Sequence, residues 1–410
     1  MTVSKQSLWA KLNRMNTLGI TTETNIFLSA AEQSSQLESL ANSALSRGID
    51  LYMKQDYETA IKEFRRSIGL SPLSSYSADA SHYMANAYLR MNDSENAIKA
   101  YQTAIRLHPE REDAYVNLGN LYFSHERYQE AASRYQEAVR INPSANNYFS
   151  LGQAYLNAGE FDKAESQFNR VRSLESEKPN GYYGLGLVLS KKGRHEEAIR
   201  QFEKALTLKN DLFDAYAEIG YAYADLGQMG EAEEIVASLK QEAPDLADTL
   251  SRYMYKVDPP KLMFAYFSST FKYRLSAKTP VSALDAYLKT ADTTKTFTMK
   301  FQFNKEMDRT SVENPFNWSI SRTTGGGPGQ AYNFGMTILD TEVTLAPIPD
   351  AVTYDSKTLM ATIYFKVQQN PAADGTIDPS HIAFKFNGKD QYGLSMDPGK
   401  DQFTGFSGIA

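Results

Sequence analysis

Six alanines between residues 60 and 232 recur at a nearly constant interval, and this interval constrains the fold more than any other feature. They are separated by 37, 34, 33, 34 and 34 residues, and each follows another small residue by twelve positions. The alanines are Ala60, Ala97, Ala131, Ala164, Ala198 and Ala232, and the preceding small residues are Gly48, Ala85, Gly119, Gly152, Gly186 and Gly220. A fixed period near 34 is typical of one helix–turn–helix unit that stacks repeatedly and buries its apolar face on its neighbours.

Residues 112–145 show what the positions of one unit do. In the first half Tyr115, Leu118 and Tyr122 recur at i, i+3 and i+7, so they share one face of a helix. Gly119 has no side chain at the same level, which lets a second helix approach closely. The unit therefore predicts two closely crossing helices.

The same residue types return in register elsewhere. A large apolar residue stands four positions after each alanine: Phe64, Tyr101, Tyr135, Phe168, Phe202 and Val236. Prolines, which a helix interior does not tolerate, end four of the six units: Pro72, Pro109, Pro143 and Pro244. This pattern resembles the tetratricopeptide repeat (TPR) family over residues 41–246, in units 41–74, 78–111, 112–145, 145–178, 179–212 and 213–246. The resemblance implies a right-handed α-solenoid of six repeats whose first helices line a concave, protein-binding face.

The flanks of the array have their own roles. Residues 1–40 are predicted to form an N-terminal cap or arm, with helical stretches around Leu8–Met15 and Ile26–Leu40. Residues 247–260 are predicted to form a capping helix followed by a proline-rich linker, because a solenoid end needs a cover for its apolar face. The insertion after Pro72 predicts a longer connection or an extended second helix in the first unit.

The period changes from 3.6 to 2 in residues 261–410. In Thr296–Asn304 four apolar side chains alternate with polar ones, which indicates a half-buried strand. Ala361–Val367 and Ile382–Phe386 alternate in the same way and are separated by turn-rich runs. The chain is therefore predicted to be a multidomain α plus β protein, with an antiparallel β-sandwich after the solenoid.

Two short motifs refine this prediction. The matching residues are Phe303, Met307, Asp308, Ser311 and Val312 in the first motif, and Lys389, Asp390 and Gly393 in the second. They resemble the Ig-like domains of bacterial S-layer and other envelope proteins, which implies a bacterial, Ig-like sandwich. Residues 323–334, with the glycine run Gly325–Gly329, are an insertion relative to that pattern.

Composition limits the class of protein. The 410 residues carry a net charge of −6 and no cysteine, so neither a nucleic-acid partner nor a disulfide or thiolate site is expected. No run of 18 apolar residues is present, so no membrane insertion is expected. The N-terminal residues lack a signal-peptide pattern, which predicts a cytoplasmic protein; export to the cell surface by a non-Sec route is the alternative.

No pattern indicates catalysis, a cofactor or a metal. The histidines are scattered, and three of them fall at turns between predicted helices, where exposed turn residues are expected: His108, His125 and His195. The glycine run lacks the Lys-Ser/Thr that completes a phosphate-binding loop. The acidic turns Asp374–Asp378 and Asp397–Asp401 could offer oxygen ligands to calcium but lack the EF-hand register, so ordinary turn chemistry is preferred. We therefore expect a non-enzymatic protein.

The TPR resemblance assigns the partner-binding positions. Ten residues are predicted to line the concave groove: His82, Tyr83, Asn86, Asn117, Asn120, Phe149, Gln153, Tyr183, Leu187 and Tyr221. The asparagines could grip an extended backbone and the aromatic residues could pocket side chains; alternatively, the asparagines stabilise contacts between repeats. Some members of the family clamp the C-terminal carboxylate of heat-shock chaperones, but His82, Asn146 and Ser150 replace the required cations here.

These features predict a scaffold or adaptor that binds a peptide or protein segment. The Ig-like domain would position the array or contact a second partner. The alternative is a structural subunit of a bacterial surface, filament or flagellar assembly, in which the repeats associate with copies of themselves.

Overall fold

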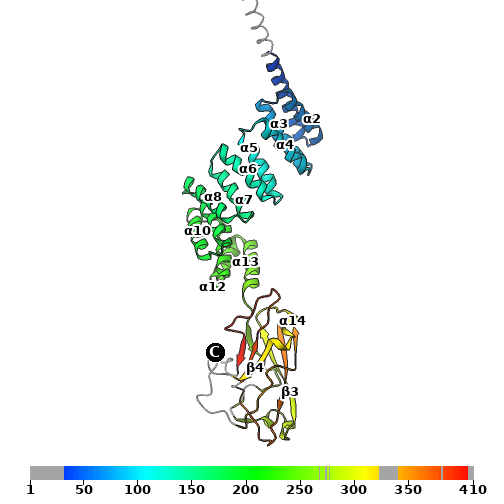
Figure 1. Ribbon diagram of the computed structural model, residues 1–410, viewed down its shortest axis with the longest axis vertical. Coiled ribbons are helices and arrows are strands. Elements are labelled where there is room, and N and C mark those ends of the chain that lie inside the picture. The colour runs from blue at the N-terminus through cyan, green and yellow to red at the C-terminus, as the bar shows by residue number, and fades with distance from the viewer. Residues whose placement is uncertain are drawn as a thin grey trace, which may run out of the picture. The chain divides into compact units, whose positions relative to one another are not determined.

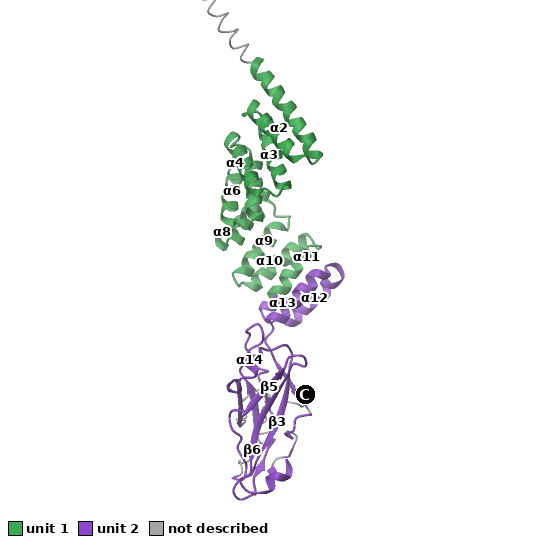
Figure 2. Ribbon diagram, turned by 90° about the vertical axis from the view of Figure 1, so that its right-hand side faces the viewer, with its two compact units in different colours: residues 1–222 green, residues 223–410 purple. Residues whose placement is uncertain are grey.

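The computed structural model describes residues 32–404, except residues 267, 273, 274, 277, 323–339, 380 and 381. The chain divides into two compact units, residues 1–222 and residues 223–410, which are coloured separately in Figure 2. Unit 1 is helical, and unit 2 contains two long helices and all of the described strands (Figure 1).

Consecutive helices of unit 1 pack in pairs joined by short turns (Figure 1). The pairs are residues 32–53 with α2 (Tyr57–Leu70), α3 (Ser75–Arg90) with α4 (Ser94–Leu107), α5 (Glu112–Ser124) with α6 (Tyr128–Ile141), α7 (Ala145–Asn157) with α8 (Phe161–Leu174), and α9 (Asn180–Lys191) with α10 (His195–Leu208). α11 (Phe213–Asp225) follows. The predicted helix–turn–helix repeats are confirmed, and the first helix begins within the residues predicted as an N-terminal arm.

The periodic glycines make room for the aromatic residue of the second helix. A Cβ atom added to Gly186 would lie 2.4 Å from the ring of Phe202, and one added to Gly119 would lie 2.7 Å from the ring of Tyr135. Gly48 and Gly152 face Phe64 and Phe168 in the same way. These four repeats therefore close by packing one buried ring onto a residue that has no side chain.

Gly184 extends this packing from one repeat to the next. It lies on α9, and a Cβ atom there would lie 2.3 Å from the ring of Phe168 on α8. We expect Gly184→Ala to destabilise unit 1 by about 1–3 kcal/mol through overpacking. Urea unfolding of the full chain measures this difference. Gly69→Ala is the matched control, because no atom lies within 4 Å of the added Cβ atom and alanine favours the helix. Equal stabilities of the two variants would contradict this packing argument.

The insertion after Pro72 does not have the predicted form. The connection from α2 to α3 is short, and α3 has 16 residues, whereas α5 and α7 have 13 each. The insertion therefore lengthens the first helix of the second repeat at its N-terminus. Side-chain hydrogen bonds hold this added turn in place: the Ser77 hydroxyl donates to the Pro72 carbonyl, and His108 Nε2 lies 2.7 Å from Ser77 Oγ.

The same contacts correct the expectation for His108. This side chain is only 6% exposed, whereas His125 is exposed as predicted. The added turn of α3 covers His108, so its burial is a consequence of the insertion rather than of the repeat pattern.

Unit 2 begins with the end of α11 and continues with two further helices and then with strands. The helices are α12 (Met229–Glu242) and α13 (Pro244–Val257), and α13 starts with a proline at a position where helices tolerate one. The strands are β1 (Leu262–Ala265), β2 (Thr279–Pro280), β3 (Thr294–Phe303), β4 (Trp318–Arg322), β5 (Ala351–Asp355), β6 (Met360–Gln368), β7 (Thr376–Ile377), β8 (Ile382–Phe386) and β9 (Gln402–Thr404). Short helical turns are η1 (Val281–Ala283), η2 (Ala286–Lys289), α14 (Arg309–Val312) and η3 (Pro315–Asn317). From residue 32 to residue 257 there are thirteen helices, one more than six pairs require.

The strands form antiparallel sheets over one hydrophobic core. The larger sheets have the orders β1-β3-β6-β5 and β4-β8-β9, and β2 pairs with β7. Every second residue of β3 from Phe297 onward is buried, as the alternation predicted. The ring of Phe301 on β3 lies 6.0 Å from Trp318 and 5.4 Å from Phe384, so the two larger sheets share this core.

The two predicted sequence motifs meet in unit 2. Met307 pairs with Asp390 in an isolated β-bridge. The amide of Asp308 donates to the Lys389 carbonyl at 3.1 Å, and the amide of Lys389 donates to Ser311 Oγ at 2.9 Å. Two segments about 80 residues apart in the sequence are therefore joined at one end of the sheets.

Candidate functional site

The ten predicted groove residues all lie on first helices of the repeats in unit 1. Asn120 is exposed and the other nine are half-buried: His82, Tyr83, Asn86, Asn117, Phe149, Gln153, Tyr183, Leu187 and Tyr221. Partial exposure leaves part of each side chain available to a partner. Their assignment to partner binding remains a prediction.

Three of these residues form one polar cluster across the second and third repeats. The Asn86 amide nitrogen lies 3.0 Å from Nε2 of His82, and the Asn117 amide nitrogen lies 3.2 Å from Nδ1 of the same ring. A neutral imidazole carries only one acceptor nitrogen, so only one amide can donate to it at a time. His82 therefore couples α3 to α5, and the asparagines contribute to packing between repeats.

Two of the asparagines each accept a hydrogen bond from a tyrosine on the second helix of the same repeat. The hydroxyl of Tyr101 donates to Asn86 Oδ1 at 3.1 Å, and the hydroxyl of Tyr135 donates to Asn120 Oδ1 at 2.6 Å. Burial raises the pKa of each of these tyrosines to about 12, so both hydroxyls keep their protons at neutral pH. Asn120 stays exposed, which leaves its amide accessible from solvent.

The sequence contains a signal for these tyrosine–asparagine hydrogen bonds. It becomes visible only when two positions of each repeat are compared together. In both repeats the tyrosine follows its asparagine by 15 residues. In the fourth and fifth repeats the ring lacks a hydroxyl, and the residues 15 positions earlier are Gln153 and Leu187. Tyrosine thus occurs together with asparagine, and phenylalanine without it.

The aromatic groove residues pack on buried rings of the second helices. Tyr83 stacks on Phe64 with the ring centroids 5.8 Å apart. Phe149 lies 5.5 Å from Phe168, and Tyr183 lies 5.8 Å from Phe202. Each pair presents a half-buried ring on a rigid, fully buried base, which is an arrangement suited to holding an apolar side chain.

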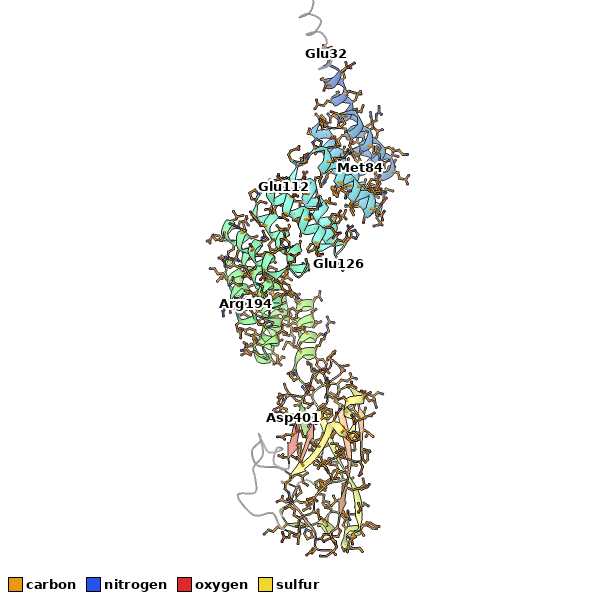
Figure 3. All side chains as sticks on the ribbon, viewed as in Figure 1. Glu32, Met84, Glu112, Glu126, Arg194 and Asp401 are labelled. Carbon is orange, nitrogen blue, oxygen red and sulfur yellow. The ribbon has the colours of Figure 1, made fainter. Side chains whose placement is uncertain are left out.

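Two further polar ties between repeats lie outside the predicted set. Arg111 Nη1 pairs with Asp79 Oδ1 at 2.8 Å and links α5 to α3. Glu112, labelled in Figure 3, accepts hydrogen bonds from Asn142 and Asn147, each at 2.6 Å. Asn147 is only 4% exposed, so these contacts order the junction of the third and fourth repeats.

The other candidates for chemistry have structural roles or lie outside the described residues. Asp374 accepts from the Asn370 amide, and Asp401 (Figure 3) pairs with Lys385 at 3.1 Å. His381 and the run Gly325–Gly329 fall outside the described residues. Within the described parts, no three His, Asp or Glu side chains converge as a metal site would require.

No helix among residues 32–404, so far as they are described, is long and apolar enough to cross a bilayer.

Comparison with known proteins supports the repeat assignment. Anaphase-promoting complex subunit 3 of Schizosaccharomyces pombe is 25% identical over 126 residues, which are 29% of this chain and 19% of that protein. The chain thus covers about a fifth of this relative's length.

Solved structures with related repeats include YrrB and a protein of Parabacteroides merdae. YrrB, described as a TPR protein with an unusual peptide-binding site, is 23% identical, with coverage of 46% of this chain and 97% of its own, and a TM-score of 0.38. The tetratricopeptide repeat protein from Parabacteroides merdae is 15% identical, with coverage of 54% and 90% and a TM-score of 0.46.

One family profile matches residues 30–256, and its description is Cilia and flagella-associated protein 70 C-terminal domain. Tetratricopeptide arrays are generally non-catalytic scaffolds for protein interactions. Because the profile covers more than half of the chain, this protein belongs to the tetratricopeptide family described by that name.

Proposed function

We propose that unit 1 binds an extended or helical segment of a protein partner along the first helices of repeats two to five. The observation that carries this proposal is the set of aromatic, amide and aliphatic side chains on successive first helices from His82 to Leu187, all of them half-buried except the exposed Asn120. Such a surface buries apolar side chains of a peptide and offers amides to its backbone. The protein would act as a scaffold without catalysis of its own.

Substitutions on this face test the proposal. Tyr83→Ala removes a half-buried ring and should weaken partner binding by about 2 kcal/mol or more. Asn117→Ala removes an amide and should cost about 0.5–1.5 kcal/mol. Calorimetric titration with a partner captured on the full chain gives both values.

The control for these variants is Gln136→Ala, an exposed change on the second helix α6. It should leave the affinity unchanged. Thermal unfolding of each variant separates a loss of binding from a loss of stability. Unaltered affinity in the folded Tyr83→Ala, Asn117→Ala double variant would rule out this face as the binding surface.

We also propose that residues 261–410 form an Ig-like sandwich that positions the array or contacts a second partner. The shared core of the two larger antiparallel sheets and the meeting of the two sequence motifs support this proposal. Secondary-structure chemical shifts and long-range NMR contacts of unit 2 would test the strand order that an Ig-like domain requires.

Cytoplasmic residence of the protein, and its alternative, export to the cell surface, remain predictions. Cell fractionation of its native source would distinguish cytoplasmic residence from export.

A further inference from the structure

The last two helices of the array leave a position for one more helix. Met254 on α13 lies 34 residues after Gly220, so it occupies the register of the small residue in a first helix. In four of the repeats before it, a glycine in that register receives a buried ring from the following second helix. After α13 the chain continues instead into a proline pair and β1, so no second helix of this repeat follows.

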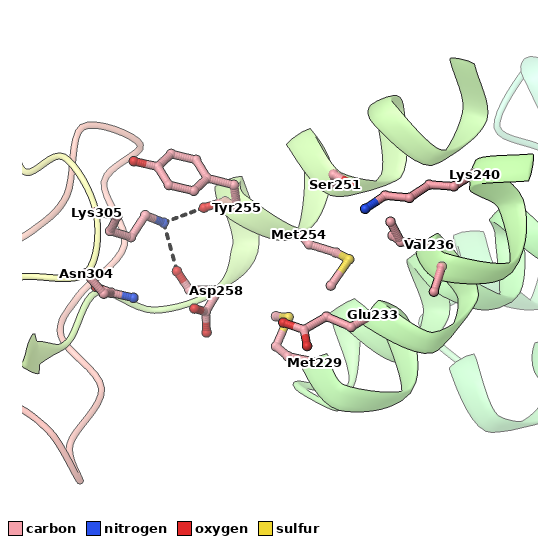
Figure 4. Close-up of a pocket in the computed structure, with 11 residues that line it drawn as sticks. Met229, Glu233, Val236, Lys240, Ser251, Met254, Tyr255, Asp258, Asn304 and Lys305 are labelled. Atoms are coloured by element: carbon pink, nitrogen blue, oxygen red, sulfur yellow. Dashed lines mark hydrogen bonds between the residues drawn. The ribbon is translucent and has the colours of Figure 1, made fainter. Parts of the chain in front are cut away.

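A groove of about 530 Å³ lies beside α12 and α13 (Figure 4). The α12 residues that line it are Met229, Glu233, Val236, Ala237 and Lys240, and those of α13 and its end are Ser251, Met254, Tyr255 and Asp258. On both helices the lining residues recur at three- and four-residue spacing, so each helix contributes one continuous face. The groove is of the size that holds a drug-sized ligand or a few apolar side chains of a peptide.

One end of the groove is closed by Lys305, whose charge is already satisfied. Its Nζ donates to the carbonyls of Tyr255 at 2.6 Å and Asp258 at 2.8 Å, as Figure 4 shows, and lies 2.7 Å from Asp390 Oδ2. This lysine therefore shapes the groove but does not attract a ligand. Lys240 is the remaining basic side chain of the lining.

The two helices are acidic. Residues 229–258 carry seven acidic and three basic side chains, a net charge of −4, and Glu233 and Asp258 belong to the lining. An occupant with an apolar stripe and basic side chains would complement both the shape and the charge of the groove.

Such a segment exists in this chain, among the residues that the structure does not describe. In residues 1–20 the apolar side chains Leu8, Leu12 and Met15 follow the i, i+4, i+7 spacing of one helical face. The same 20 residues carry Lys5, Lys11 and Arg14 and no acidic side chain.

We propose that the groove between α12 and α13 binds the N-terminal segment, residues 5–15, of a second copy of this chain. The segment would take the place of the missing second helix. Because the two surfaces of this contact differ, it is heterologous, and copies would join head to tail into open chains unless the geometry closes a ring. This contact is separate from the partner-binding face proposed for unit 1.

Two single substitutions in the full chain test the contact. Ala237→Arg places a bulky cation in the groove at an exposed position, and Leu12→Glu disrupts the apolar stripe of the segment. Ser238→Arg is the matched control, because it is the adjacent exposed residue of α12 and does not line the groove. Circular dichroism verifies that all three variants fold as the unaltered chain does.

Sedimentation velocity over a range of protein concentrations gives the readout. The unaltered chain and Ser238→Arg should increase in mass with concentration, and raised salt should weaken this association. Ala237→Arg and Leu12→Glu should each associate at least tenfold more weakly. A mixture of these two variants should form dimers and no larger species, because only one intact groove and one intact segment remain per pair.

Any of four results would overturn the proposal. The unaltered chain could stay monomeric at every concentration, as it would if the segment bound its own groove. Ala237→Arg could associate as strongly as Ser238→Arg. The mixture of the two variants could fail to form dimers. Leu12→Glu could leave the association intact, and this result would assign the groove to another occupant.

Discussion

Lys305→Met should lower the free energy of unfolding of unit 2 by about 3–5 kcal/mol, because it leaves a buried carboxylate without its counter-ion. The side chain of Lys305 is 1% exposed and that of Asp390 is completely buried, with their charged atoms 2.7 Å apart. The substitution also removes the donor that satisfies the carbonyls of Tyr255 and Asp258 at the end of α13. Methionine keeps the approximate length of the side chain, so the loss reports the charge and the hydrogen bonds rather than a large cavity.

Tryptophan fluorescence measures this loss in unit 2. The chain contains two tryptophans, so a Trp9→Phe background leaves Trp318, which is buried in the β core, as the reporter of urea unfolding. Lys366→Met is the control, because its pair with Asp350 is exposed and such pairs contribute about 0–1 kcal/mol.

A second substitution separates the charge from the geometry. Asp390 Oδ1 accepts hydrogen bonds from the amides of Tyr392 and Leu394, and asparagine can retain an acceptor there without a charge. The double variant Lys305→Met, Asp390→Asn should therefore recover part of the stability that Lys305→Met loses. A loss of less than about 1 kcal/mol in Lys305→Met would show that the buried pair is not needed for stability.

The example of Lys305 shows which part of the structure the sequence could predict. Asp390 belongs to one of the two motifs recognised in the sequence, and it pairs with Met307 of the other motif in an isolated β-bridge. Lys305 carried no such signal, because its partners Tyr255 and Asp390 lie 50 and 85 residues away and follow no period. Contacts at a fixed separation can be read from one sequence, whereas contacts between unrelated segments depend on the folded topology.

The candidate binding face could likewise be predicted only in part from the sequence. The repeat register placed His82, Asn86 and Asn117 on first helices without knowledge of the structure. It could not show that His82 lies between the two amides, because this depends on how neighbouring repeats stack. The burial of His108 was missed for a related reason: the extra turn of α3 that covers it breaks the period.

Phe168→Ala should destabilise the array by about 3–5 kcal/mol, since it removes a fully buried ring that two repeats share. A Cβ atom on Gly152 would lie 2.8 Å from this ring and one on Gly184 would lie 2.3 Å from it. Both glycines lie against the ring of Phe168 and have no side chain, so neither of them can fill the cavity that Phe168→Ala leaves. Phe161→Ala is the control on the same helix, where the half-buried ring should cost less.

The position of Phe168 also predicts which part of the array should unfold most easily in the Phe168→Ala variant. In a repeat protein each unit is stabilised mainly by its nearest neighbours, so loss of a shared ring weakens one junction more than the rest. Hydrogen exchange of the full chain in dilute urea should therefore show faster exchange in α7, α8 and α9 than in α3 and α4. Uniform acceleration along unit 1 would contradict this local view. The ring of Phe149 packs on that of Phe168, with the ring centroids 5.5 Å apart. Phe168→Ala should therefore also weaken partner binding, because the groove residue Phe149 loses the ring that holds it in place.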